Sequence, residues 1–332
     1  MRIQHNVSLR PYNTFRMDVP AEMLAEITDT EQLEQVPAAA ERHILGGGSN
    51  VLLTRPVPGL VLLNRLKGIR RVREDDRHVW LEVQSGEVWH ELVLYAIAHN
   101  LAGIENLALI PGTTGAAPIQ NIGAYGAEVK ETVDQVTAWH WQERCFVSYS
   151  NEQCRFGYRD SIFKQELKGS VFITSVLFRL NRQPSYHIAY GSVAQELERM
   201  GIRELSIAAV AEAVMAIRRS KLPDPAQIGN AGSFFKNPVI TADHFQSLKK
   251  AYPAIPFYPA GDSVKVPAGW LIEQCGWKGC RRGDAGVHEK QALVLVNYDH
   301  AQGTDIRQLS DDIVASVAER FGITLEKEVQ VW

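Results

Sequence analysis

Residues 229–238 constrain the fold more strongly than any other segment of the chain. They read Gly-Asn-Ala-Gly-Ser-Phe-Phe-Lys-Asn-Pro, with two glycines three positions apart and a proline at the end. Glycine lets a backbone turn and approach a ligand closely, and Pro238 stops a regular element. We therefore expect neither an ordinary helix nor an ordinary strand, but a constrained loop that presents the hydroxyl of Ser233. Clusters of this composition also form plain surface turns, so other parts of the sequence must decide between a turn and a site.

Length and composition predict a folded protein with more than one domain. The chain has 332 residues, of which 45% are hydrophobic and 22% charged, values typical of globular proteins. The formal net charge is -3 and the Lys and Arg residues are dispersed, so we expect no positive patch that would attract a nucleic acid. No run approaches the roughly 18 apolar residues of a membrane span, and residues 1–10 are polar, without the apolar stretch of about 7–15 residues that is typical of a signal peptide. We expect a cytoplasmic monomer that binds neither nucleic acid nor membrane.

The cysteines predict neither a disulfide scaffold nor a metal site. They lie at positions 145, 154, 275 and 280. Four are too few for a disulfide-rich fold, and none forms the Cys-x-x-Cys pair of a zinc site. We expect free thiols packed as small apolar residues.

Hydrophobic periodicity predicts a mixed α and β protein. Strands are expected at 43–45, 51–53, 59–63, 79–83, 133–141, 171–180 and 292–296, and helices at 87–100, 207–219 and 305–320. Ser85 and Gly86 stand at the start of the first helix, Ser206 is placed to cap the second, and Gly322 ends the third. The stretch 222–269 is rich in Pro, Gly and Asn, which predicts loops lining a site.

Three segments suit a ligand that carries phosphate or carboxylate groups. Residues 46–50, Gly-Gly-Gly-Ser-Asn, follow a predicted strand and expose backbone N–H groups that can cradle a pyrophosphate, although a hairpin turn has the same composition. Residues 110–126 form a long stretch of small residues that suits a large, flat, polar ligand. Arg159, within 156–161, is either a surface ion pair with Asp160 or a clamp for a carboxylate. The fingerprints of a Rossmann unit and a P-loop are both missing.

Taken in chain order, the motifs resemble one enzyme family. They are GGGSN at 46–50, PGT at 111–113, QNIGAYG at 120–126, YRD at 158–160, KLPDP at 221–225, the segment 229–238 and LEKEV at 325–329. This set is similar to the motifs of the UDP-N-acetylenolpyruvoylglucosamine reductase family and runs along almost the whole chain. Each motif is weak by itself, but the ordered set is highly specific.

The resemblance implies a flavoenzyme of peptidoglycan precursor synthesis. Members bind FAD without a covalent link, take hydride from NADPH, and reduce UDP-N-acetylglucosamine enolpyruvate to UDP-N-acetylmuramate. It also implies an α+β fold: an FAD-binding fold of the vanillyl-alcohol-oxidase (PCMH) type in two subdomains, residues 1–67 and 68–203, and a separate α/β substrate-binding domain, residues 204–319. Residues 320–332 are expected near the first subdomain.

The resemblance also implies roles for individual residues. Ser233 matches the proton donor, and Arg159 and Glu328 match two residues that assist it. Hydride addition to the alkene leaves negative charge that extends into the carboxylate, which a preorganised Arg159 would stabilise. A serine is a weak acid in water, but it can protonate a carbanion if it is well placed. Glu328 would orient the substrate or a water, or reprotonate Ser233, and the sequence leaves these roles open.

The remaining matched positions concern binding. Tyr158, Lys221 and Asn237 match substrate-binding residues, and Tyr190 matches a tyrosine that closes over the UDP group in the longer of the two family types. The residues matched to FAD binding are Gly46, Gly47, Gly48, Ser49, Asn50, Pro111, Gly112, Thr113, Gly115, Ala116, Gln120, Asn121, Gly123, Ala124, Tyr125 and Gly126. No residue is matched to a metal.

Two other functions fit parts of the sequence. An FAD oxidase of the same flavin-binding fold, acting on a sugar or an alcohol, would need a histidine or cysteine near the flavin or an oxygen-reactive site, and residues 46–50 contain neither residue. A nucleotide-sugar binding module without catalysis would have lost the proton donor. Ser233, Arg159 and Glu328 are all present, which favours the reductase.

Overall fold

The chain folds into two compact units, each assembled from separate stretches of sequence. The computed structural model describes residues 1–37, 41–189 and 191–332. The first unit contains Met1–Val7, Ala21–Gly47 and Pro58–Ser220, and the second contains Ser8–Pro20, Gly48–Val57 and Lys221–Trp332. Two short N-terminal stretches therefore complete a unit that is otherwise C-terminal.

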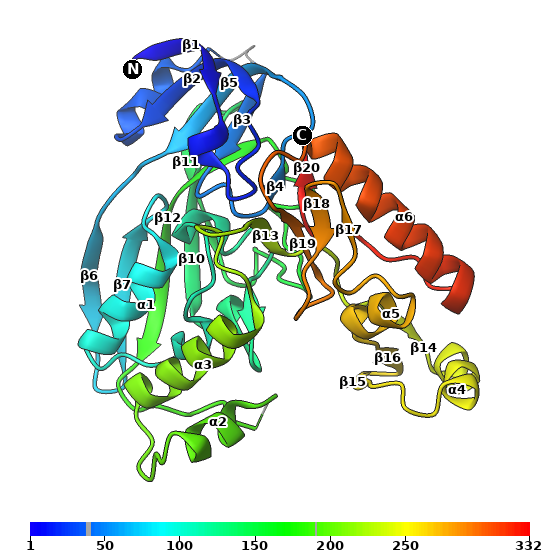
Figure 1. Ribbon diagram of the computed structural model, residues 1–332. Helices are drawn as coiled ribbons and strands as arrows, with labels where there is room; N and C mark the ends of the chain where they lie inside the picture. Colours follow the sequence, from blue (N-terminus) through cyan, green and yellow to red (C-terminus); the bar gives the residue numbers. More distant parts are fainter. Residues whose placement is uncertain (38–40, 190) are drawn as a thin grey trace. The chain divides into compact units, whose positions relative to one another are not determined.

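A five-stranded antiparallel sheet is the centre of the first unit (Figure 1). Its order is β11 (Cys145–Ser150), β10 (Val133–His140), β12 (Val171–Asn181), β7 (His78–Gln84) and β6 (Ile69–Glu74). One face packs against helices α1 (Trp89–Ala98) and α3 (Ile207–Lys221) in a large apolar core. Strand β12 is buried along most of its length, because both of its faces are covered.

A second sheet covers the other face of that centre. Its order is β1 (Ile3–Ser8), β2 (Pro20–Ile27), β5 (Val57–Asn64) and β3 (Arg42–Leu45), and β3 runs parallel to β5. Ile27 and Leu62 from this sheet pack with Trp139 and Phe172 from the five-stranded sheet. The first unit also holds helix α2 (Val193–Arg199) and the short pair β8 (Gly123–Ala124) and β9 (Ala127–Glu128). The two sheets thus share one apolar interior.

The second unit has a smaller antiparallel sheet and three helices. The sheet order is β13 (Gly229–Ser233), β19 (Val294–Asn297), β18 (Ala285–Val287) and β17 (Arg281–Arg282). A three-stranded sheet follows the order β14 (Val239–Thr241), β16 (Ser263–Lys265) and β15 (Tyr258–Ala260). The helices are α4 (Ala242–Ala251), α5 (Ala268–Gln274) and α6 (Gly303–Phe321). Strand β20 (Gln330–Val331) pairs in parallel with β4 (Val51–Leu52).

Most of the predicted elements are confirmed. The Ser206 hydroxyl accepts a hydrogen bond from the Ala209 amide at 3.1 Å, as expected of a cap. Gly322 ends α6 in the left-handed conformation, with φ +65°. Ser85 and Gly86 do not begin α1, whose N-cap is Val88. Their backbone instead belongs to the turn that follows β7.

Two further expectations are wrong. The stretch 222–269 contains helix α4 with its own cap, since Thr241 Oγ1 accepts from the His244 amide; the frequent Pro and Gly hid this helix. The four thiols are free, but only Cys154 is buried, whereas Cys145 is exposed. Cys145 opens the outer strand β11, where one face has no cover.

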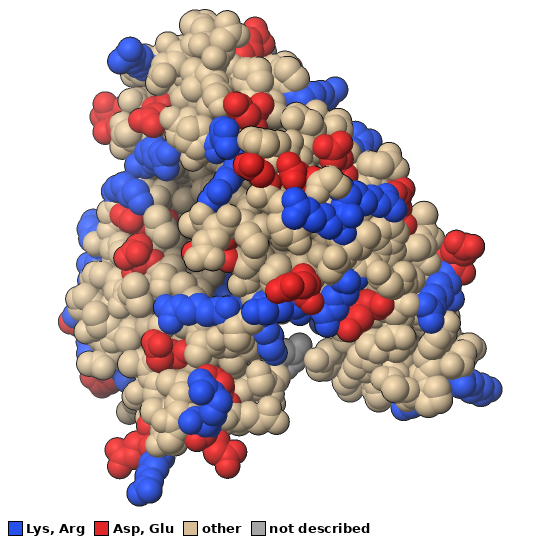
Figure 2. Space-filling model, viewed as in Figure 1, with Lys and Arg blue, Asp and Glu red and all other residues tan. Residues whose placement is uncertain are grey.

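Charged side chains of both signs are interspersed on the face of the molecule in Figure 2, in keeping with the small net charge. Across residues 1–37, 41–189 and 191–332, none of the helices combines the length and apolar character that a membrane crossing requires.

Candidate active site

The glycines that follow β3 are packed too closely for any side chain. A Cβ on Gly46 would overlap Thr113 Oγ1, and a Cβ on Gly47 would lie 3.1 Å from the Cα of Gly112. The first two residues of the predicted GGGSN motif and the predicted PGT motif are therefore neighbours in the first unit. Gly48 belongs to the second unit and has φ +60°. Such close backbone approach leaves main-chain groups available to a ligand.

The loop of residues 110–126, which we call the cofactor loop, is anchored by main-chain hydrogen bonds to the end of β7 and the start of α1. The amide of Thr114 donates to the Glu87 carbonyl at 2.8 Å, and that of Gly115 donates to the Ser85 carbonyl at 2.8 Å. The other predicted cofactor residues of the first unit follow along this loop: Pro111, Ala116, Gln120, Ala124 and Gly126. The loop therefore has a defined shape although it has little side-chain bulk.

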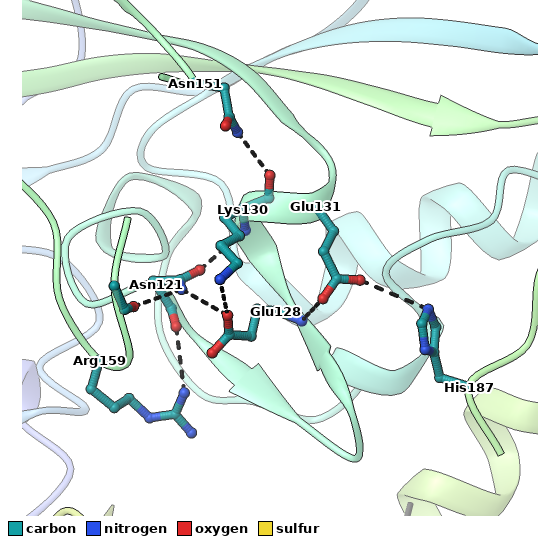
Figure 3. A network of polar contacts seen from close by, with 8 residues as sticks. Asn121, Glu128, Lys130, Glu131, Asn151, Arg159 and His187 are labelled. Carbon is teal, nitrogen blue, oxygen red and sulfur yellow. Dashed lines mark hydrogen bonds and ion pairs between the residues drawn. The ribbon is translucent and has the colours of Figure 1, made fainter. Parts of the chain in front are cut away.

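A polar network joins the cofactor loop to Arg159 (Figure 3). The Arg159 guanidinium donates to the carbonyl of Gly123 at 2.6 Å and to that of Asn121 at 3.4 Å. The Asn121 side chain donates to the Gly157 carbonyl at 2.9 Å and to Glu128 Oε2 at 3.2 Å, and it accepts from the Lys130 amide at 3.1 Å. The structure thus brings the predicted residues Asn121, Gly123 and Arg159 together.

Three residues of this region have left-handed backbones. They are Asn121 with φ +47°, Tyr125 with φ +49° and Arg159 with φ +54°. Asparagine tolerates this conformation, but tyrosine and arginine seldom adopt it, and such outliers cluster at functional sites. The guanidinium of Arg159 also lies over the ring of Tyr158, 5.4 Å from its centroid. Arg159 is therefore held in one arrangement by both its backbone and its side chain.

Several buried polar side-chain atoms of the first unit have no hydrogen-bond partner, and some of them lie at the cofactor loop. Among the described residues, the buried atoms without a hydrogen-bond partner include Thr114 Oγ1, Asn106 Oδ1 and Arg218 Nε. Burial lowers the pKa of Arg218 and raises that of Tyr125, whose charge interacts with Arg218. A buried polar atom without a partner costs about 1–3 kcal/mol. Asn106 and Arg218 lie near Tyr125 of the cofactor loop, because the Asn106 side chain donates to the Tyr125 carbonyl at 2.8 Å and Arg218 interacts with Tyr125. Hydroxyl, amide and guanidinium groups along this loop match the carbonyls, ribityl hydroxyls and pyrophosphate of FAD, so these residues fit that cofactor.

Ser233 lies at the end of a strand, which corrects the expectation of a pure loop. Residues 229–233 form β13 and pair with β19, with a register shift between Asn230 and Ser233. Gly232, inside this irregularity, has φ +69°. The glycines do not prevent the strand; they allow its bulge. Ser233 is exposed at the point where regular pairing stops.

Glu328 lies on a segment that pairs with the residues after Ser233. Its amide donates to the Phe234 carbonyl at 2.8 Å, and the Lys236 amide donates to the Glu326 carbonyl at 2.9 Å. Asn50 also reaches this segment, because its side chain donates to the Glu328 carbonyl at 3.3 Å. Asn50, Ser233 and Glu328 are far apart in sequence but lie on neighbouring segments of the second unit. Arg159 belongs to the first unit.

The other predicted residues differ in how the structure places them. Lys221 is exposed at the end of α3. Asn237 Oδ1 accepts from the Ala268 amide at 2.9 Å, at the first residue of α5, so this side chain also has a structural role. Ser49 is half-buried in the turn before β4. Tyr190 lies outside the described residues.

Sequence reasoning missed Arg218, Trp89 and His90. The sequence attributes α1 to core packing, and Trp89 is indeed buried. Its indole also donates to the Leu107 carbonyl at 2.9 Å, and His90 Nδ1 accepts from the Leu109 amide at 3.1 Å. No spacing rule signals these contacts, because both join a helix to a loop of irregular shape. The pair of arginines at 218–219 near the end of a predicted helix was a weak signal for Arg218.

Comparison with known proteins first defines the class. Residues 21–142 match the model of an FAD binding domain, which covers the glycine cradle and the cofactor loop. The expected fold class, mixed α and β with an FAD-binding fold, is confirmed, and the chain is an FAD-dependent oxidoreductase.

The family follows from the remainder of the chain and from whole-length relatives. Residues 224–332 match the C-terminal domain of UDP-N-acetylenolpyruvoylglucosamine reductase. The enzyme of that name from Chromobacterium violaceum is 48% identical over 335 residues, 99% of this chain and 98% of the relative. The one from Flavobacterium johnsoniae is 46% identical over 336 residues and the whole of both chains. This chain belongs to the UDP-N-acetylenolpyruvoylglucosamine reductase family.

A solved structure agrees with that assignment. The crystal structure of UDP-N-acetylenolpyruvylglucosamine reductase from Thermus caldophilus superposes with a TM-score of 0.69 at 26% sequence identity. The match covers 100% of this chain and 99% of the other. The likeness extends over both units and is not confined to the FAD-binding domain.

Proposed function

We propose that this protein reduces UDP-N-acetylglucosamine enolpyruvate to UDP-N-acetylmuramate, with NADPH as the reductant, in peptidoglycan precursor synthesis. The names of the whole-length relatives support this substrate. The observation that carries the proposal is the pairing of Glu328 with Phe234, because it sets the proposed proton donor Ser233 one residue from the segment that bears a carboxylate. We propose that the Ser233 hydroxyl and the Glu328 carboxylate serve delivery and recovery of the proton.

The first unit supplies most of the cofactor site in this proposal. Gly46, Gly47 and the cofactor loop would hold the FAD phosphates and ring system. Gly48, Ser49 and Asn50, which follow in sequence, are also proposed to bind FAD. FAD, when bound, supplies transfer of hydride from NADPH to the enolpyruvyl alkene. The protein's own task is to orient the cofactor and exclude water. We also propose that residues 1–67 and 68–203 form two FAD-binding subdomains and that residues 204–319 form the substrate-binding domain.

Ser233 is the proposed proton donor. It is exposed at the end of β13, and the buried Phe234 and Phe235 that follow fix the direction of the chain at this point. The proton would leave Oγ for the carbon next to the carboxylate, on one face of the substrate. Glu328 would restore the proton to Ser233 or orient the donor.

Arg159 is proposed to stabilise the negative charge that develops on the substrate carboxylate. Its guanidinium is already fixed on the carbonyls of Asn121 and Gly123, so little reorganisation is needed when charge appears. Tyr158, Lys221 and Asn237 would bind the substrate, and Tyr190 would close over its UDP group. Lys221 has an exposed cationic side chain, which suits a phosphate.

The first experiment separates the two half-reactions. We expect the purified protein to be yellow and to oxidise NADPH only when the enolpyruvyl substrate is present. In Ser233→Ala, bleaching of the flavin by NADPH should keep its rate, whereas reoxidation by the substrate should slow by about 10²–10⁴-fold, the usual contribution of a general acid.

Ser247→Ala is the matched control, because Ser247 is an exposed serine of α4. This variant should retain both rates. An equal loss of both rates in Ser233→Ala would make Ser233 a structural or flavin-site residue. A colourless protein that stays inactive with added FAD would contradict the proposed reaction itself.

A further inference from the structure

The entrance to the cofactor loop is held in a conformation that its own sequence disfavours. Leu109, immediately before the loop, has φ +56°. For a residue with a Cβ, the left-handed region costs roughly 1–2 kcal/mol, and leucine lacks the short polar side chain with which asparagine offsets this cost. Some contact outside the loop must therefore keep Leu109 in place.

That contact comes from His90, in the first turn of α1. The amide of Leu109 donates to His90 Nδ1 at 3.1 Å. Trp89 holds the chain on either side of Leu109. Its amide donates to the Gly112 carbonyl at 3.0 Å, and its indole donates to the Leu107 carbonyl at 2.9 Å. Two consecutive helix residues thus fix the chain at 107, 109 and 112, the last of which lies beside Gly47 in the cradle.

The hydrogen bond at Leu109 sets the protonation state of His90. Because the amide is the donor, Nδ1 must offer its lone pair, and the proton of the neutral ring must be on Nε2. An imidazolium carries a proton on both nitrogens and cannot accept from Leu109. The link therefore exists only while His90 is neutral.

The surroundings of His90 favour the neutral ring. Burial is the main cause that lowers the pKa of His90, and Arg219 and Arg218 on α3 lower it further, while Glu91 on its own helix raises it. Since the pKa is lowered on folding, the neutral form predominates at neutral pH. The hydrogen bond is lost as the pH falls through that lowered pKa.

We propose that His90 is a positioning residue for the FAD site. Neutral His90 holds the entrance of the cofactor loop in the conformation that binds FAD. Protonation of His90 releases the loop and lowers the affinity for FAD. The inference rests on the assignment of this loop to FAD in the proposed function. It adds a side chain on the helix side of the site, one that touches the loop and need not touch the cofactor.

The test compares two replacements that differ in where they place an acceptor. In His90→Asn, the side-chain oxygen takes the place of Nδ1 and does not titrate. In His90→Gln, the amide extends toward the position of Nε2 and leaves the Leu109 amide without its partner. His99→Asn is the matched control, because His99 is an exposed histidine at the end of the same helix.

FAD affinity is measured by flavin fluorescence between about pH 5 and about pH 8, across the range in which histidine titrates. We expect the wild type and His99→Asn to lose about tenfold or more in affinity toward the acidic end, which corresponds to one hydrogen bond. His90→Asn should bind nearly as tightly as the wild type near neutrality and show a flatter profile. His90→Gln should bind about tenfold more weakly near neutrality.

Equal pH profiles for the wild type and His90→Asn would overturn the inference, as would full affinity in His90→Gln. If His90→Gln fails to fold, nitrogen NMR of the wild-type ring still tests the claim, because a proton on Nδ1 near neutral pH would contradict it. Failure of the proposed function is distinguishable, since a protein that binds no FAD at any pH would refute the FAD assignment itself.

Discussion

Substitution of Gly48 by alanine tests whether the glycine cradle is required by geometry. Gly48 has φ +60°, and an added Cβ would overlap the Tyr12 carbonyl oxygen and lie 2.7 Å from the Cα of Asn13. Both neighbours are backbone atoms of the second unit, so a side-chain rotation cannot relieve the clash. The left-handed conformation costs about 1–2 kcal/mol, and overpacking adds about 1–3 kcal/mol.

The matched control is Gly232→Ala in the same unit. Gly232 has a similar φ of +69°, but an added Cβ would meet nothing within 4 Å. Only the conformational cost of about 1–2 kcal/mol applies there. The difference between the two variants isolates the close approach of the backbone at residue 48.

Urea unfolding, followed by circular dichroism, gives the assay. We expect Gly48→Ala to lower the free energy of unfolding by about 2–5 kcal/mol, and by more than Gly232→Ala does. FAD affinity should fall in Gly48→Ala as well, because the shift of the 46–50 segment alters the cradle. Equal destabilisation of the two variants would refute the packing argument and leave φ as the sole constraint.

Three further outcomes follow from individual contacts. Trp89→Phe keeps an aromatic ring but removes the donor to the buried Leu107 carbonyl, so the free energy of unfolding should fall by about 1–3 kcal/mol. No change in the unfolding midpoint would contradict this. Burial raises the pKa of Cys154 to about 12, so a thiol reagent near neutral pH should label the exposed Cys145 first and Cys154 only after denaturation, as mass spectrometry of the labelled peptides would show. Gly303→Ala would drive a Cβ into the backbone of Leu53 and Thr54, the two residues after β4, and the free energy of unfolding should fall by about 1–3 kcal/mol; wild-type thermal stability would refute that.

Local sequence signals were sufficient to predict a helix or its end wherever the residues of that element alone decide its structure. The stripe of Ile207, Val210, Val214 and Ile217 on α3 is buried as predicted, because helical periodicity is a property of consecutive residues. Gly322 ended α6 for the same kind of reason, since only a local left-handed residue is needed. The sequence did not predict helix α4, because the frequent Pro and Gly around it outweighed a short amphipathic pattern.

The site depended on the sequence in a different way. The ordered motifs identified the family, since a reaction restricts which residues can occupy particular positions. They could not reveal that the residues after Ser233 pair with the Glu328 segment, because pairing between residues about 90 positions apart is decided by packing of the whole unit. Nor could they reveal His90, whose role depends on the conformation of Leu109.

What the sequence alone determined, then, is the class, the family and the set of polar side chains from which a site can be built. The tertiary structure alone decided which of them meet: Gly46 with Thr113, Arg159 with Gly123, and the 229–238 segment with the end of the chain. Residues 229–238 illustrate the division. Their composition suggested a loop, yet pairing with β19 makes the first half a bulged strand, because hydrogen bonds from a neighbouring strand outweigh the weak local preference of glycine.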